Sequence, residues 1–342
     1  MTLFLQLLLS QQVKLERLEN SKVNLSAKES KEISGGVLKR ERASISCLLS
    51  LIEETHPESF KILGQIYPYT GKAFRIGVTG FPGAGKSSVI NRLAKQFLDK
   101  KRSVGVILVE AAHPVNHGVM FSDRIRMKDI QNHPDVFIRS MAARHGRASM
   151  AQTSRHAADV LDAAGYEIIL VETLGVGQME MDIVRESHET ITVLTPEYAD
   201  EAHALRQGVM ETSSFVVVNK IDRDKDNLWY KRLMSVLNNG NGAGADHKPR
   251  VFPVSALTGS GVEDLFAALC ESFKKQGRVA SENGKNGTLD REVVSTLGEL
   301  FFSELFHRHD IAKKIENSRE DLASRKTSPY DVARSILRTY LK

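Results

Sequence analysis

Short runs of β-branched and other apolar residues alternate with helical stretches between about residue 60 and residue 275. The runs lie at 74–78, 103–109, 167–171, 190–194, 215–218 and 251–254. Most of them are continuously apolar, which is typical of parallel strands that are buried on both faces. Strands that alternate with helices along a chain form parallel sheets with helices on both faces. The pattern therefore predicts an α/β fold with a doubly wound, mostly parallel sheet.

The segments on either side of this region have a different pattern. In residues 1–58, apolar residues recur at helical spacing beyond an expected break at Gly35-Gly36, at Leu38, Ile45, Leu48, Leu49 and Ile52. Residues 276–288 are rich in Gly, Ser and Asn and are typical of a linker, and residues 289–342 again look helical. We expect an N-terminal helical extension (1–58), a sheet-containing domain (59–275), a linker (276–288) and a C-terminal helical segment (289–342).

The composition restricts the class of protein. Of the 342 residues, 41% are hydrophobic and 26% are charged, which fits a soluble globular protein with a sizeable core rather than a fibrous or membrane protein. The formal net charge of +5 is too small an excess to call for a nucleic-acid partner. Cys47 and Cys270 lie far apart and lack metal-ligand spacing, which favours a cytoplasmic location.

The N-terminal ten residues are strongly apolar, but they lack a basic n-region and a small-residue cleavage site. They continue directly into a mixture of polar and apolar residues at 11–18, so we expect an amphipathic helix rather than a signal peptide. No apolar run reaches the roughly 20 residues that a membrane-spanning helix needs. Membrane association is therefore not expected.

The segment from Gly80 to Ser87 reads Gly-Phe-Pro-Gly-Ala-Gly-Lys-Ser, a complete G-x-x-x-x-G-K-S motif. It follows a predicted strand and precedes a predicted helix, which is the context in which the motif binds phosphates. Its glycines allow successive backbone N–H groups to turn towards phosphate oxygens, Lys86 reaches the β- and γ-phosphates, and Ser87 can ligate Mg²⁺. The residues expected to bind the phosphates are Gly80, Gly83, Ala84, Gly85, Lys86, Ser87 and Ser88.

A second element, Asn219-Lys-Ile-Asp222, follows the predicted strand at 215–218. Guanine carries N1–H and an exocyclic amine side by side, and the Asp222 carboxylate can accept a hydrogen bond from each, whereas adenine has no donor at these positions. A Ser-Ala-Leu segment after the last predicted strand would offer a backbone N–H to the base O6. The nucleotide is therefore predicted to be GTP or GDP. The residues expected at the base are Asn219, Lys220, Asp222, Ser255, Ala256 and Leu257.

Acidic residues at strand ends are the candidates for a Mg²⁺ site. Glu172 follows the run at 167–171, where an acid binds Mg²⁺ directly or through water, and the N–H of Gly175 would contact the γ-phosphate. Glu110 follows the run at 103–109, and Asp123 lies in the loop beyond it. The residues alone leave open whether Glu110 and Asp123 are metal ligands or ordinary surface acids.

Further motifs carry a specific resemblance. They are Val171-Glu-Thr-Leu-Gly-Val-Gly-Gln178, Phe137-Ile-Arg-Ser140, Asp162-Ala-Ala-Gly165, Asp200-Glu201 with Arg206-Gln-Gly208, and Pro329-Tyr-Asp331. Together with the nucleotide motifs, they make residues 36–340 resemble the MeaB/ArgK/MMAA group of P-loop GTPases, which are G-protein chaperones of cobalamin-dependent acyl-CoA mutases. The resemblance implies a GTPase that gates delivery of adenosylcobalamin to such a mutase and that protects or reactivates the mutase.

The resemblance also implies a homodimer and a set of metal ligands. The C-terminal segment, 289–342, corresponds to the dimerisation arm of the family. The Mg²⁺ neighbourhood of the family corresponds to Ser87, Glu110, Asp123 and Glu172. Lys86, Glu172 and Asp123 are then expected to support catalysis by stabilising charge and holding the metal, and no general base is identified.

The chain departs from the family pattern in the loops that should move during hydrolysis. It has Glu110-Ala-Ala-His113 where the relatives usually carry Asp-Pro-Ser-Ser, and Glu is one methylene longer than Asp. It also has His145-Gly-Arg-Ala-Ser149 where the relatives have more glycines, which permit unusual φ angles. We expect nucleotide binding to survive these changes and hydrolysis to be slow.

Other functions stay open from the residues alone. A metallochaperone GTPase that inserts nickel would need Cys and His ligands near the moving loops. A P-loop kinase acting on a metabolite or a transport protein would prefer ATP and leave Asp222 without a role. A non-catalytic scaffold would hold GTP or GDP without turnover. An RNA-binding GTPase would need a basic stripe with interleaved aromatic residues, which the sequence does not show.

Overall fold

The fold is described from a computed structural model of the chain. The described residues are 25–111, 127–143, 147–173, 186–196, 213–223, 230–231, 234, 249–279, 293–298, 300–301 and 309–340. Those within 30–54 and 61–283 form one compact unit, and those within 25–29, 55–60 and 284–342 belong to another. The first unit holds the sheet and is described first.

Within the described residues, the sheet has seven parallel strands in the order β3-β2-β4-β1-β5-β6-β7. The strands are β1 (Phe74–Gly80), β2 (Val104–Ala111), β3 (Val136–Ala143), β4 (Ile168–Glu172), β5 (Glu189–Leu194), β6 (Phe215–Val218) and β7 (Arg250–Pro253). The prediction of a doubly wound parallel sheet is confirmed. Six strands coincide with the six predicted runs. The seventh, β3, lies at an edge of the sheet, where Arg139 and Ser140 interrupt the apolar pattern.

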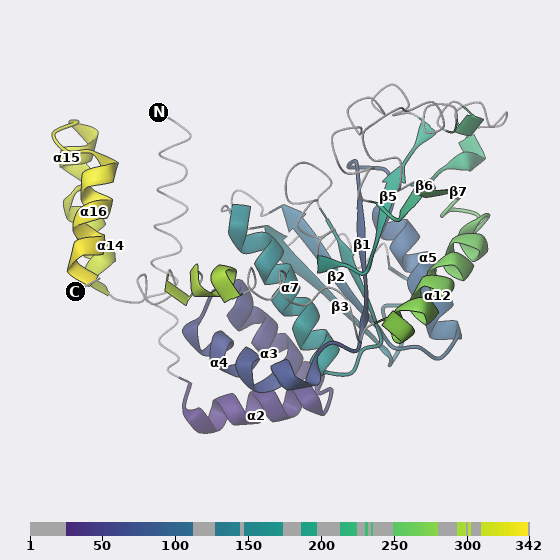
Figure 1. Cartoon of the computed structure of the whole chain (residues 1–342), viewed down its shortest axis with the longest axis horizontal. Coiled ribbons are helices and arrows are strands. Elements are labelled where there is room, and N and C mark those ends of the chain that lie inside the picture. Colours follow the sequence, from purple (N-terminus) through teal and green to yellow (C-terminus); the bar gives the residue numbers. More distant parts are fainter. Residues whose placement is uncertain are drawn as a thin grey trace. The chain divides into compact units, whose positions relative to one another are not determined.

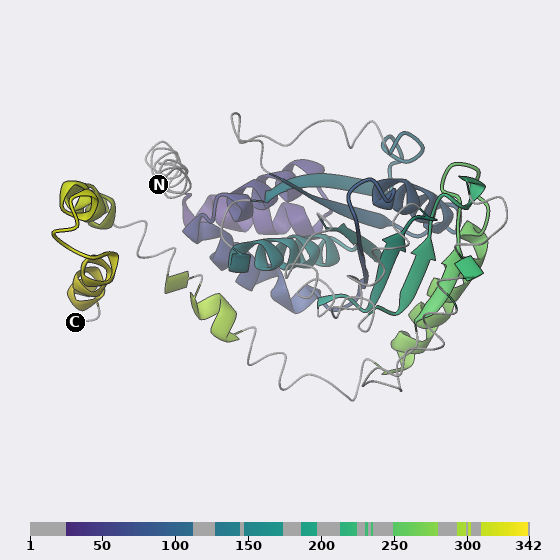
Figure 2. The same ribbon diagram turned by 90° about the horizontal axis from the view of Figure 1, so that it is seen from above.

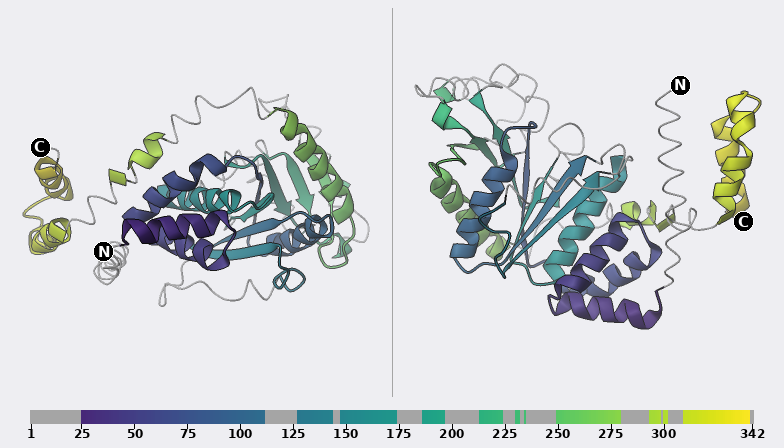
Figure 3. Two further views of the ribbon diagram at one scale, coloured as in Figure 1. Left: turned by 90° about the horizontal axis from the view of Figure 1, so that it is seen from below. Right: turned by 180° about the vertical axis from the view of Figure 1, so that it is seen from behind.

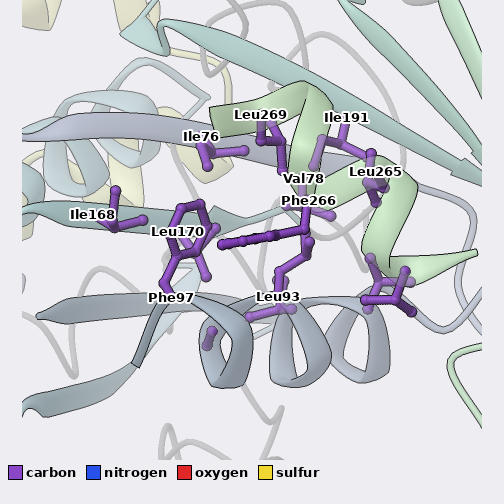
Figure 4. Packing of buried hydrophobic residues seen from close by; sticks show 14 of the residues in the cluster. Ile76, Val78, Leu93, Phe97, Ile168, Leu170, Ile191, Leu265, Phe266 and Leu269 are labelled. Carbon is purple, nitrogen blue, oxygen red and sulfur yellow. The ribbon is translucent and has the colours of Figure 1, made fainter. Parts of the chain in front are cut away.

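Helices cover both faces of this sheet, as Figures 1, 2 and 3 show from different sides. One face packs against α5 (Lys86–Asp99) and α12 (Val262–Val279). Figure 4 shows Leu93 and Phe97 of α5 beside Phe266 of α12, under Ile76 and other strand residues. The other face packs against α7 (Arg147–Ala163), α3 (Arg42–Glu53) and residues of α2 (Ala27–Leu38) and α4 (Pro57–Ile66). A 3₁₀ turn, η1 (Tyr67–Tyr69), precedes β1.

The N-terminal helices correct one detail of the sequence interpretation. The expected break at Gly35-Gly36 lies inside α2, and the chain turns instead after Leu38, where Arg40 has a φ of 61°. Gly36 is needed for packing, because a Cβ there would lie 2.0 Å from the Ser44 Oγ of α3. The other expected apolar positions, Ile45, Leu48, Leu49 and Ile52, are buried in the core of this unit, while Leu38 is exposed.

The C-terminal part of the chain is helical where it is described. Helix α12 runs to Val279, so the first four residues of the expected linker belong to it. In the second unit, residues 293–298 are helical and are followed by α14 (His309–Asn317), α15 (Arg319–Ala323) and α16 (Pro329–Tyr340). The Lys314 Nζ of α14 donates to the Thr339 Oγ1 of α16 at 3.2 Å. Within the described residues, no helix combines the length and the apolar character that crossing a bilayer requires.

Candidate nucleotide-binding site

The loop after β1 has the backbone conformation that its glycines were expected to provide. Gly80, Gly83 and Gly85 have φ angles of 136°, 79° and 92°, values that side-chain-bearing residues rarely adopt. Two of them also allow close approach. A Cβ at Gly80 would lie 2.1 Å from the Val193 carbonyl oxygen, and a Cβ at Gly85 would lie 2.3 Å from the Asn219 Nδ2. The loop therefore fits tightly between β5 and the segment after β6.

Lys86 begins helix α5 and is buried. Its ammonium donates to the Gly80 carbonyl at 2.8 Å and to the Phe81 carbonyl at 3.3 Å. The N-terminus of α5 and this ammonium concentrate positive charge at the loop. A phosphate is the ligand that such an arrangement attracts. Of the other predicted phosphate residues, Ala84 is buried, and Gly83 and Ser88 are exposed.

Ser87, the second residue of α5, lies beside Glu172 at the carboxyl end of β4. Glu172, the last residue of β4, pairs in register with Val78 of β1, and the Ser87 Oγ donates to its Oε1 at 3.0 Å. The next residue, Thr173, fastens the pair, because its N–H donates to the Val78 carbonyl at 3.0 Å and its hydroxyl to the Thr79 hydroxyl at 3.1 Å. A hydroxyl and a carboxylate thus lie together where the sequence predicts a metal.

Asn219 joins the phosphate loop to the base loop. Its side chain is buried, its Nδ2 donates to the Ala84 carbonyl at 2.8 Å, and its Oδ1 accepts from the Ala256 N–H at 3.0 Å. Its own N–H donates to the Leu194 carbonyl at 2.7 Å. The following residue, Lys220, has a φ of 62°. The Asn219 side chain, which the sequence predicts at the base, is thus bonded to backbone atoms of both loops.

Asp222 lies in the 3₁₀ turn η3 (Ile221–Arg223) and is exposed. Its Oδ1 accepts from the Ser255 hydroxyl at 2.5 Å. Ser255 is buried and also accepts from the Thr258 N–H at 3.2 Å. The turn after β6 and the turn after β7 are therefore linked at the carboxylate that is predicted to select guanine.

Arg92 is a residue of this region that the sequence did not single out. It lies on α5, about 1.7 turns after Lys86. Its Nε donates to the Ala256 carbonyl at 2.9 Å and its Nη2 to the Leu257 carbonyl at 2.7 Å. The sequence carries no signal for these contacts, because an arginine on a helix is ordinary and its acceptors are backbone atoms 164 and 165 residues away.

Three of the predicted site residues lie wholly or partly outside the described residues. Gly175 and Asp123 lie outside the described residues. The backbone of Glu110 belongs to β2, two residues beyond Leu108, which pairs in register with Glu172. This register puts the Glu110 backbone near the same edge of the sheet, and its side chain lies outside the description.

Comparison with known proteins gives one family. The family model of the "Methylmalonyl Co-A mutase-associated GTPase MeaB" matches residues 45–313. The chain is 33% identical over 308 residues to a putative GTPase of Pyrococcus horikoshii, covering 87% of this chain and 94% of that protein. It is 30% identical over 282 residues to the GTPase ArgK of Escherichia coli, covering 79% and 85%. A Caenorhabditis elegans protein named methylmalonic aciduria type A homolog, mitochondrial, is 25% identical over 314 residues, covering 87% and 75%.

A solved structure has the same fold. The structure titled LAO/AO transport system kinase superimposes with a TM-score of 0.63 at 23% identity, covering 93% of this chain and 99% of that chain. At this identity the likeness concerns the fold. It agrees with the parallel sheet and flanking helices described above.

Proposed function

Because the chain belongs to the family of methylmalonyl-CoA mutase-associated GTPases and is a GTPase, we propose that it is a G-protein chaperone of a cobalamin-dependent acyl-CoA mutase. Its nucleotide state gates the delivery of adenosylcobalamin to the mutase, and the protein protects or reactivates that enzyme. The observation that carries the proposal is the family match over residues 45–313. The match extends on both sides of the strands, whereas a generic nucleotide-binding likeness would be limited to the loops around the phosphates.

The site supports a division of labour in GTP hydrolysis. The N–H groups of the glycine-rich loop and the Lys86 ammonium stabilise the charge that builds on the phosphates, and this positioning supplies most of the catalysis in phosphoryl transfer. Asp222 accepts from guanine, and Asn219 keeps the phosphate loop and the base loop at a fixed separation. The products are GDP and phosphate. Slow turnover is part of the proposal, because the loops beyond Glu110 depart from the family pattern.

The proposal includes Mg²⁺, and the described residues fit it. The Ser87 hydroxyl and the Glu172 carboxylate lie within one hydrogen bond of each other, and Mg²⁺ prefers oxygen ligands of these kinds. When bound, the ion would neutralise negative charge on the phosphates. Ser87 and Glu172 would hold it, with Glu110 and Asp123 as the further ligands that the sequence suggests.

We also infer a homodimer that forms through the C-terminal segment, 289–342. The support is a set of apolar side chains in the helical residues 293–298, where Val293, Val294 and Leu297 are exposed. Apolar side chains exposed together on one short helix mark an interaction site more often than a free surface. Light scattering tests this inference: deletion of residues 289–342 should give monomers, and the triple variant Val293→Ser, Val294→Ser, Leu297→Ser should do the same at full length. An unchanged mass for both would reject the arm as the dimer contact.

A cytoplasmic location is part of the same proposal. The two cysteines, Cys47 and Cys270, are both unpaired, which suits a reducing compartment. Fractionation of cells that produce the full chain would test it, and recovery in a membrane or secreted fraction would contradict it.

The client relationship is tested with a purified cobalamin-dependent acyl-CoA mutase from the same organism. We expect the mutase to bind the chain in the presence of a non-hydrolysable GTP analogue, to bind less with GDP, and to accelerate single-turnover GTP hydrolysis. Lys86→Ala is the matched control and should lose the nucleotide dependence. If the mutase neither binds nor changes hydrolysis or adenosylcobalamin loading, the chaperone proposal is wrong and the chain is a GTPase with another partner.

A further inference from the structure

Arg92 connects α5, the helix that follows the glycine-rich loop, to the loop at 255–257, which is expected to bind the base. Two neighbouring donors of one guanidinium, Nε and Nη2, contact two successive carbonyl oxygens, those of Ala256 and Leu257, at 2.9 and 2.7 Å. The planar guanidinium holds its donors in a fixed fork. Two such bonds fix the orientation of the loop as well as its position.

The helix end of this connection is rigid. Leu93, next to Arg92, is fully buried, and Phe97 packs edge-on against Phe266 of α12 with ring centroids 4.9 Å apart. Figure 4 shows these side chains under the sheet. Because α5 cannot rotate without breaking this core, the Arg92 side chain leaves the helix in a set direction. The guanidinium therefore transmits the position of α5 to the loop.

The loop end shows which backbone donor this arrangement leaves available. The Ala256 N–H is used by the Asn219 Oδ1, and the Thr258 N–H by the Ser255 Oγ. Among the described residues, the Leu257 N–H has no hydrogen-bond acceptor. In a trans peptide the C=O and the N–H point in opposite directions. Since the Ala256 carbonyl points to Arg92, the Leu257 N–H of the same peptide points away from it.

We infer that Arg92 is a positioning residue for guanine recognition, which orients the Ala256–Leu257 peptide so that the Leu257 N–H donates to the base O6. This inference rests on the proposed recognition of guanine by Asp222 and the loop at 255–257. It assigns different parts of guanine recognition to Asp222 and Arg92. Asp222 accepts from N1–H and the 2-amine of guanine, and Arg92, acting through the peptide, sets the donor that meets O6.

Two nucleotide analogues separate these contacts. In 6-thio-GTP a sulfur replaces O6 and is a weaker acceptor, while N1–H and the 2-amine are kept. In ITP the 2-amine is missing and O6 is kept. Affinities of the full-length chain for GTP, 6-thio-GTP and ITP are measured by competition with labelled GDP. The wild-type chain should prefer GTP to 6-thio-GTP by about 3- to 10-fold, the value of one neutral hydrogen bond.

Arg92→Met keeps the apolar stem and removes the donors. We expect its preference for GTP over 6-thio-GTP to fall to about 1 and its preference for GTP over ITP to stay at the wild-type value. A general structural defect would change both ratios. Lys95→Met, at an exposed position on the same helix, is the control and should change neither ratio. Arg92→Gln, which retains one side-chain donor, makes the same measurement possible if Arg92→Met does not fold, and it should lower the 6-thio-GTP ratio.

The outcomes distinguish this inference from the proposal on which it rests. If wild type shows no preference for GTP over 6-thio-GTP, or if the Arg92 variants keep that preference, Arg92 does not set an O6 donor. If both ratios fall together in Arg92→Met, the residue has a general structural role and the inference is also wrong. If wild type does not prefer GTP to ITP and Asp222→Asn changes nothing, the recognition of guanine by Asp222 itself fails.

Discussion

The two ends of strand β1 carry polar networks of opposite kinds. At its start, Arg75 donates to Asp159 at 2.7 Å and to Asp162 at 3.0 Å. Asp162 also accepts the N–H groups of Gly71, Lys72 and Ala73 at 2.8, 3.1 and 3.0 Å. At the other end, Lys86 donates to the carbonyls of Gly80 and Phe81. Two strands away, after β6, Asp222 accepts from the Ser255 hydroxyl.

The two networks differ in function: one stabilises the fold, and the other is proposed to bind a nucleotide. The network at the start of β1 is closed, since Asp162 is almost fully buried and its two oxygens accept four hydrogen bonds from the chain itself. Buried carboxylates that are paired in this way hold a structure together, and removing one partner is costly. At the other end, Asn219 joins the loops to each other, and the proposed role of Lys86 and Asp222 is to bind a nucleotide. Stability and binding should therefore respond to different substitutions.

The largest expected effect is that of Asp162→Ala, and it concerns the free energy of unfolding alone. It leaves the N–H groups of Gly71, Lys72 and Ala73 without their acceptor and removes one of the two carboxylates that Arg75 contacts. We therefore expect the free energy of unfolding to fall by about 3–5 kcal/mol. Urea unfolding measures this loss. Asp159→Ala, which removes one contact to Arg75, should cost less. A weaker affinity for GTP in the folded Asp162→Ala variant would contradict the idea that stability and binding depend on different ends of β1.

Lys86→Ala should act on binding alone. The ammonium makes charge-assisted hydrogen bonds with phosphate, and its loss should lower GTP affinity about 100-fold. Calorimetry with GTP and Mg²⁺ measures the change, and urea unfolding of the nucleotide-free chain should be close to wild type. Unchanged GTP affinity would contradict the assignment of the loop at 80–87 to the phosphates.

Asp222→Asn should change the choice of base and little else. The carboxylate acceptor becomes an amide that can donate to the 2-oxo group of xanthine, so we expect xanthosine triphosphate to bind better than GTP, with a shift of about 10-fold or more. Competition between the two nucleotides gives the ratio. Retained guanine preference would remove the loop at 219–222 from base recognition.

The smallest expected effect is on the pH dependence of stability, and it concerns His188 beside the network at the start of β1. Desolvation and the Arg75 guanidinium lower the pKa of His188 from its ordinary value of 6.5, against the opposing charges of Asp162 and Glu189. The Nδ1 of His188 accepts from the backbone N–H of Arg75 at 2.9 Å. The unfolded chain then binds the proton more readily, so stability is full above pH 6.5 and is lost as the pH falls towards the lowered pKa.

His188→Asn supplies an acceptor oxygen without a titrating ring. It should remove part of this pH dependence, although it also loses the stacking of His188 on Phe74. Urea unfolding between about pH 7 and pH 5 measures the slope. An identical slope in both proteins would show that His188 does not titrate differently on folding.

The motifs of the proposed nucleotide loops can be recognised in the sequence because their residues are local. The glycines, Lys86 and Ser87 lie within eight residues, and strand ends can be recognised from apolar runs. Long-range partners were not predictable. Asp162 and Arg139 were recognised as parts of family motifs, but only the structure shows that Asp162 accepts from the start of β1 and that Arg139 pairs with Glu53 and Ser50 of α3.

Other differences have equally specific causes. Gly35-Gly36 resembled a helix break, and the close approach of Ser44 explains why a small residue is needed inside α2 instead. Pro329-Tyr-Asp331 resembled a family signature, and it forms the start of α16, where the Asp331 N–H donates to the Ser328 hydroxyl at 3.1 Å and that hydroxyl donates back to the carboxylate at 2.6 Å. Such capping is local, and the spacing of Ser328 and Asp331 could have indicated it.

Asn219 has a consequence for how this site can be altered. Its amide presents a donor to one loop and an acceptor to another, and neither Asp nor Leu, although similar in size, offers both. Asp222 is exposed to solvent, and its carboxylate contacts these loops at the Ser255 hydroxyl. Under the proposed role of Asp222 in base selection, an engineer who wants an orthogonal variant that ignores cellular GTP should redesign position 222 and leave position 219 intact.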